Sequence, residues 1–83
     1  MSEIKDEMFE TRVSNIKREL LDFANAITKR EYNKECYDHI LEQADLYHEL
    51  LNSRGLENGK TNLAVDYIKR RYSEYLEKGF PEY

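Results

Sequence analysis

Apolar residues recur in the first third of the chain at alternating steps of four and three residues. This spacing joins Phe9, Val13, Ile16, Leu20, Phe23 and Ile27, and it places them on one face of an α-helix. Carboxylates gather near the start of this segment, and Lys29 and Arg30 lie at its end, which is the favourable arrangement of charge in the field of a helix dipole. The pattern predicts a long helix over residues 3–30.

A second helical pattern covers residues 33–52, with Asn33 as its candidate N-cap. The heptad spacing also continues through residues 27–44, so one continuous rod is the alternative. In such a rod Arg30 and Lys34 would both lie in the apolar seam, and burying two like charges together costs free energy. We therefore favour a break at residues 31–33. The apolar side of the second helix consists of Tyr37, Ile40, Leu41, Ala44, Tyr47 and Leu51.

A loop over residues 53–61 follows, and it carries two of the three glycines. Thr61 or Asn62 is the candidate cap of a third helix over residues 62–78. Gly79 and Pro81 come next, in the usual order of a helix stop. The sequence thus predicts an all-α fold in a single domain, residues 1–83, built as a three-helix bundle or as a long helical hairpin with a C-terminal helix.

Composition narrows the class of protein further. The 83 residues are 40% hydrophobic and 36% charged, with three Gly, one Pro and one Cys. So few turn residues argue against an all-β fold, and a single cysteine excludes an internal disulfide. No apolar run approaches the roughly 18 residues of a membrane span, and the acidic N-terminal segment is unlike a signal peptide. We expect a cytoplasmic protein that does not enter a membrane.

The second predicted helix carries a one-sided excess of negative charge. Residues 31–50 contain six acidic side chains against Lys34 alone, a net charge of −5, whereas the whole chain carries −4. Five of these acids recur at steps of three and four residues, nearly opposite the apolar side, so they form one line along the helix. We call this line the acidic ridge, and it consists of Glu35, Asp38, Glu42, Asp45 and Glu49.

Two interpretations of the acidic ridge stay open at this point. As a docking surface, it would steer a partner with a basic surface towards the helix. As a solvated face, it would keep the protein soluble or pair with Lys69, Arg70 and Arg71 of the third predicted helix.

Seven tyrosines are a second unusual feature of the composition. Five of them lie on or near the apolar sides of the predicted helices, and tyrosine is enriched in protein interfaces because one end of its ring is apolar and the other polar. A chain this short also has a marginal core, so we expect self-association, as a dimer whose seam is formed largely by the first helix. The five tyrosines are Tyr37, Tyr47, Tyr67, Tyr72 and Tyr75, and the expected seam consists of Phe9, Val13, Ile16, Leu20 and Phe23.

These features favour a small non-enzymatic interaction protein of the adaptor or inhibitor type. It would bind a larger protein with a basic surface through the acidic ridge and a tyrosine-rich surface that includes Tyr47. In size and character it resembles the small accessory proteins that phages and mobile elements encode.

The alternative function is an oligomeric binder, or sponge, of a phosphate-bearing small molecule. The segment from Gly55 to Thr61 is not a P-loop, because three residues instead of four separate its first glycine from the Gly-Lys pair. A helix N-terminus there would still offer backbone N–H groups and one cation to an anion. The residues of this alternative site are Lys60, Thr61 and Asn62, with Arg70 or Arg71 beside them.

Other chemistries have less support in the sequence. Cys36 and His39, and likewise Asp45 and His48, are three residues apart, but a structural zinc site needs four ligands, so we expect no metal and no cofactor. Cys36 lies among acidic residues, which weakens a thiol nucleophile, and no other catalytic arrangement is evident. A pI of about 5.2 argues against nucleic-acid binding despite the basic run that begins at Lys69.

Overall fold

The computed structural model describes residues 2–56 and 59–81, with side chains from residue 8 onward. Within these ranges the chain forms three α-helices and no strand. The helices are α1 (Ser2–Ala26), α2 (Lys34–Asn52) and α3 (Gly59–Lys78). The expected all-α fold is confirmed.

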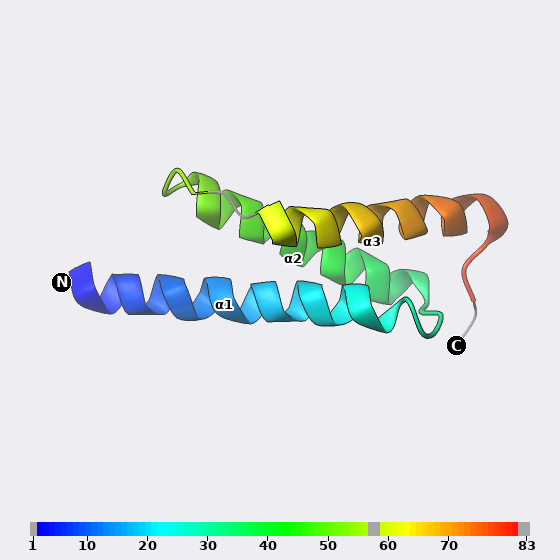
Figure 1. The fold of residues 1–83 in the computed structure, drawn as a ribbon, viewed down its shortest axis with the longest axis horizontal. Helices are drawn as coiled ribbons and strands as arrows, with labels where there is room; N and C mark the ends of the chain where they lie inside the picture. Colours follow the sequence, from blue (N-terminus) through cyan, green and yellow to red (C-terminus); the bar gives the residue numbers. More distant parts are fainter. Residues whose placement is uncertain (1, 57–58, 82–83) are drawn as a thin grey trace.

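The three helices form an antiparallel bundle. α1 and α2 run in opposite directions, and α3 returns alongside them in the direction of α1 (Figure 1). Each helix contacts both of the others, so the fold is the three-helix bundle and not the hairpin with an extension. The bundle measures 49 × 22 × 18 Å, and its length reflects α1, whose 25 residues extend about 37 Å at 1.5 Å per residue.

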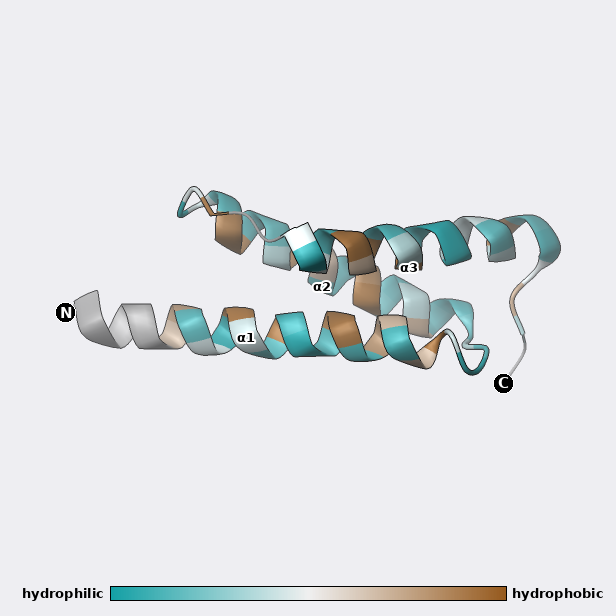
Figure 2. Ribbon diagram, viewed as in Figure 1, coloured by the Kyte–Doolittle hydropathy of each residue, from teal (hydrophilic) through white to brown (hydrophobic). Residues whose placement is uncertain are grey.

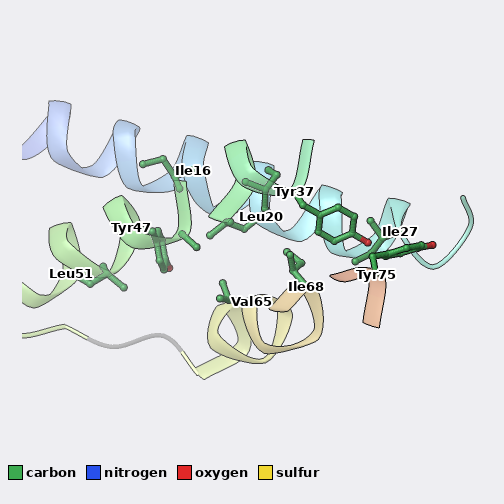
Figure 3. Close-up of a cluster of buried hydrophobic side chains, with 11 residues drawn as sticks. Ile16, Leu20, Ile27, Tyr37, Tyr47, Leu51, Val65, Ile68 and Tyr75 are labelled. Carbon is green, nitrogen blue, oxygen red and sulfur yellow. The ribbon is translucent and has the colours of Figure 1, made fainter. Parts of the chain in front are cut away.

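The core lies between the helices and draws on all three. Each helix shows apolar bands that alternate with hydrophilic ones (Figure 2), as expected for helices with one buried face. Leu20 and Ile68 are completely buried, and the side chains of the cluster point towards one another (Figure 3). The buried cluster consists of Ile16, Leu20, Ile27, Tyr37, Ile40, Ala44, Tyr47, Leu51, Val65, Ile68 and Tyr75.

The chain breaks between α1 and α2, so the continuous rod does not form. The side chain of Asn33 caps α2, because its Oδ1 accepts a hydrogen bond from the backbone N–H of Cys36 at 3.1 Å. α1 ends at Ala26, four residues earlier than expected. The reason is a tightened last turn, in which the hydroxyl and the N–H of Thr28 both donate to the carbonyl of Asn25, at 2.7 and 3.3 Å.

α3 begins at Gly59, three residues before the expected start, which shortens the loop expected over residues 53–61. Thr61 is 0% exposed, and its Oγ1 accepts a hydrogen bond from the hydroxyl of Tyr47 at 3.4 Å. The first turn of α3 therefore packs against α2 through Thr61. The expectation that Thr61 or Asn62 caps the helix is therefore wrong, because both residues lie inside it.

After α3 the chain turns back onto the bundle. Gly79 adopts a φ of +97°, a conformation that only glycine adopts readily, and its N–H donates to the carbonyl of Tyr75 at 2.7 Å. Phe80 then packs its half-buried ring against three tyrosines, with centroid distances of 5.7 Å to Tyr37, 5.6 Å to Tyr72 and 5.3 Å to Tyr75.

The apolar stripe of α1 is used within one chain. Ile16 and Leu20 are buried, and Val13 and Phe23 pack against the same core while partly exposed. Ile16 and Leu20 are therefore not available for the expected dimer seam, whereas Phe9, Val13 and Phe23 are only half-buried, and the dimer itself stays a prediction. No helix within the described ranges is long and apolar enough to cross a membrane.

Candidate functional site

The acidic ridge lies on the face of α2 that points away from the core. Four of its carboxylates, on Glu35, Glu42, Asp45 and Glu49, belong to exposed residues, whereas Asp38 is half-buried. The buried residues of α2, which include Ile40 and Ala44, occupy the opposite side of the helix. The structure thus brings all five ridge residues onto one accessible face.

Asp38 differs from the other ridge residues in having two partners. Its Oδ2 pairs with Lys34 Nζ at 2.9 Å, and its Oδ1 accepts a hydrogen bond from the hydroxyl of Tyr72 on α3 at 3.0 Å. Both contacts favour the ionised carboxylate and lower the pKa of Asp38. The hydrogen bond from Lys34 has the largest effect. The same bond raises the pKa of Lys34.

The rest of the ridge is not neutralised by the basic residues of α3. Ion pairs between described residues join Lys34 to Asp38 and Arg71 to Glu74, and His39 Nε2 lies within hydrogen-bond distance of Glu19 Oε1. Among residues 8–56 and 59–81, therefore, none links a ridge carboxylate to the basic run at residues 69–71. Arg71 instead binds Glu74 of its own helix at 2.9 Å. Pairing with α3 thus does not account for the ridge.

Three of the five tyrosines lie in the core and two lie at its edge, which corrects the expected tyrosine-rich docking surface. Tyr37, Tyr47 and Tyr75 are at most 2% exposed, and Tyr67 and Tyr72 are half-buried. Tyr47 in particular is 1% exposed, so the expectation that it contacts a partner is wrong. Their apolar rings follow the helical periodicity that any buried residue would follow, so the sequence pattern could not separate the two roles.

An aromatic cluster surrounds the ring of Tyr37. Phe23 meets it edge-on at 5.1 Å, and Tyr72, Tyr75 and Phe80 lie within 6.0 Å. Burial among these rings disfavours the phenolate and raises the pKa of Tyr37 to about 12. Burial also raises the pKa of Tyr75, whose hydroxyl donates to Glu31 Oε2 at 3.0 Å. The cluster fastens the linker before α2 and the segment after α3 to the same end of the bundle.

The residues of the alternative anion site are not brought together. Thr61 is buried, which corrects the expectation that it faces a ligand, and the oxygen of Asn62 is buried without a hydrogen-bond partner in the described part of the chain. Arg70 and Arg71 lie ten residues along α3, about 15 Å from its first turn. Arg71 is engaged with Glu74 and the ring of Tyr75. Of this set, only Lys60 is exposed at the start of the helix.

A shallow hollow beside the ridge was not anticipated from the sequence. Two adjoining depressions between α1 and α2 share Phe23, Tyr32 and Ile40, and the larger has a volume of about 360 Å³. We call them together the α1–α2 hollow, lined by Glu19, Asp22, Phe23, Ala26, Tyr32, Glu35, Cys36, His39 and Ile40. Tyr32 belongs to the linker between the helices, whose path no periodicity predicts.

The two pairs with metal-ligand spacing do not form a metal site. Within the described residues, no three His, Cys, Asp or Glu side chains gather in a way that could hold an ion. Cys36 lines the α1–α2 hollow as a half-buried free thiol, and His39 Nε2 lies 3.0 Å from Glu19 Oε1 across the same hollow.

No protein-family model matches this chain, and no curated protein or solved structure is significantly similar to it.

Proposed function

We propose that this protein is an interaction module that binds a basic partner protein through the acidic ridge of α2. One observation carries the proposal. The carboxylates of Glu35, Glu42, Asp45 and Glu49 lie on one exposed face, and no Lys or Arg among the described residues forms an ion pair with them. A partner with Lys and Arg side chains supplies the missing charge.

The energetics of α2 support the proposal. Like charges three or four residues apart each destabilise a helix by about 0.2–0.5 kcal/mol, and the ridge repeats this spacing along the helix. Lys34 and Tyr72 offset the charge at Asp38 alone. Basic side chains would relieve the remaining repulsion on binding, and the field of the ridge would accelerate their approach.

A charge-neutralising variant tests the proposal. E42Q/D45N/E49Q removes three ridge carboxylates that have no ion-pair partner among the described residues, and it leaves Asp38 and its contacts intact. The probe is a fluorescent peptide composed only of Lys and Ala, titrated at low salt and followed by fluorescence anisotropy. We expect the variant to bind it about tenfold or more weakly than the wild type, because each removed charge weakens the attraction.

The matched control is E10Q/D66N/E77Q, which removes the same number of carboxylates from exposed positions off the ridge. It changes the net charge by the same amount as the ridge variant, and we expect it to bind within about twofold of the wild type. An equal loss in both variants would mean that overall charge alone attracts the peptide, and this result would contradict a site on α2.

A further inference from the structure

We infer that the α1–α2 hollow receives one apolar side chain from the basic partner that the acidic ridge attracts. This inference rests on the proposed function and deepens it, because it assigns the ligand a second chemical feature. The partner segment would carry Lys and Arg side chains along the ridge and one aliphatic or aromatic side chain in the hollow.

The floor of the hollow is apolar and held in place by packing. Phe23 contacts the ring of Tyr32 at 5.3 Å and the buried ring of Tyr37 at 5.1 Å. Ile40 is 4% exposed and belongs to the core, and Cys36 is half-buried beside it. A floor fixed in this way needs little rearrangement on binding, which keeps the entropic cost of association low.

The charge of the rim indicates which charge would be complementary in a partner. Its acidic side chains are Glu19, which His39 contacts at 3.0 Å, together with Asp22 and Glu35, and neither Lys nor Arg is among the lining residues. Glu35 also belongs to the acidic ridge, so the hollow and the ridge form one continuous surface. An apolar floor inside an acidic rim complements an apolar side chain flanked by cations.

The shape of the hollow suits a side chain better than a free small molecule. The larger of its two depressions has a volume of about 360 Å³, near the lower end of the range of about 300–1,000 Å³ for ligand pockets, which enclose most of the ligand's surface. This hollow is a depression open to solvent, so it would enclose only a small part of a ligand's surface. A side chain that projects from a larger partner needs no such enclosure, because the surrounding interface excludes water from it.

Two peptides test the inference. The first is the peptide of Lys and Ala used for the ridge, and the second is identical except that one central Ala is replaced by Leu. We expect the Leu peptide to bind the wild-type protein about tenfold more tightly, the gain from burying most of one aliphatic side chain. C36W fills the hollow and should remove this difference, whereas the control C36A should keep it.

A second readout uses the wild-type chain, which contains a single cysteine. At matched saturation, the Leu peptide should slow the alkylation of Cys36 by iodoacetamide several-fold, and the Lys-Ala peptide should leave the rate unchanged. Circular dichroism shows whether C36W keeps its helices. If C36W loses its helices, protection of Cys36 in the wild-type protein alone tests whether the Leu side chain enters the hollow.

Each remaining outcome overturns a specific claim. Equal binding of the two peptides, still lost in the ridge variant, overturns this inference and leaves the proposed function standing. Failure of both peptides to bind overturns the proposed function, and the inference with it. A tenfold difference that survives in C36W without protection of Cys36 places the Leu elsewhere. Light scattering that shows a wild-type oligomer, dispersed by C36W, makes a second copy of this chain the occupant.

Discussion

The hydroxyl of Tyr72 donates a hydrogen bond to Asp38 Oδ1 at 3.0 Å, and this bond joins α3 to the acidic ridge of α2. It separates Asp38 from the other four ridge residues. Asp38 is held by α3 and by Lys34, so it contributes to the folded structure. The other four carboxylates make no ion pair with a described cation, and they are the ones that the proposed partner would contact.

Removing the Tyr72 hydroxyl should therefore lower stability while leaving the ring in place. We expect Y72F to lose about 0.5–1.5 kcal/mol of unfolding free energy, the usual net value of one hydrogen bond, measured by urea unfolding. The control is Y67F, because Tyr67 is also half-buried on α3 and the structure gives its hydroxyl no hydrogen bond to another described residue. Equal losses in the two variants would show that the bond to Asp38 is not what stabilises the fold.

Alkaline pH should destabilise the protein through ionisation of Tyr37. An unfolded tyrosine has a pKa near 10, and burial raises that of Tyr37 to about 12. The stabilising contribution is therefore fully present below about pH 10, and it is lost as the pH rises from about 10 through about 12. We expect a loss of roughly 2 kcal/mol across this window, measured by urea unfolding at successive pH values.

Y37F provides the comparison for this pH dependence, because phenylalanine does not ionise. Its stability should fall less steeply above about pH 10 than that of the wild type. A residual slope is expected from Tyr75, whose pKa is also raised by burial. Identical slopes in wild type and variant would contradict the assignment to Tyr37.

Two neighbouring leucines of α1 should respond very differently to truncation. Leu20 is 0% exposed in the core and Leu21 is 38% exposed. We expect L20A to lose about 2–5 kcal/mol, a large share of the 5–15 kcal/mol that is typical for a domain, and L21A to change by less than about 0.5 kcal/mol. Thermal unfolding followed by circular dichroism measures both. A comparable loss in L21A would indicate that this face of α1 is buried in solution.

Two glycines offer a similar contrast for the backbone. Gly79 has a φ of +97°, so alanine there is strained although no atom lies within 4 Å of its added Cβ. We expect G79A to lose about 1 kcal/mol and to loosen Phe80 from the aromatic cluster. Gly59 has neither a positive φ nor a neighbour within 4 Å, so G59A should be neutral or stabilising by up to about 0.5 kcal/mol. Chemical denaturation compares the two, and equal effects would rule out strain at Gly79.

Periodicity predicts most of this fold because each helix buries one side. The stripe spacing identifies Leu20, Ile27 and Ile40 as inward-facing, and the cost of burying Arg30 and Lys34 together indicates the break before α2. The start of α3 at Gly59 has no such local signal. Its first turn holds Thr61, which is buried and accepts a hydrogen bond from Tyr47 of α2, and helical spacing alone does not indicate this contact.

The candidate site divides in the same way. The acidic ridge is a property of one helix, so its residues and their common face are predictable from spacing alone. The α1–α2 hollow combines two helices and the linker residue Tyr32, and only their packing brings these together. For Tyr47 the sequence predicts the wrong role. A ring at an apolar position of a helix has the same spacing whether it contacts another protein or packs in its own core.

Dissolved ions act on the acidic ridge in two opposing ways. Screening at higher ionic strength relieves the repulsion among Glu42, Asp45 and Glu49, and this favours the folded helix. The same screening shortens the reach of the ridge's field towards any cationic partner. The ionic strength at which α2 is most stable is therefore higher than the ionic strength at which its charge attracts most strongly.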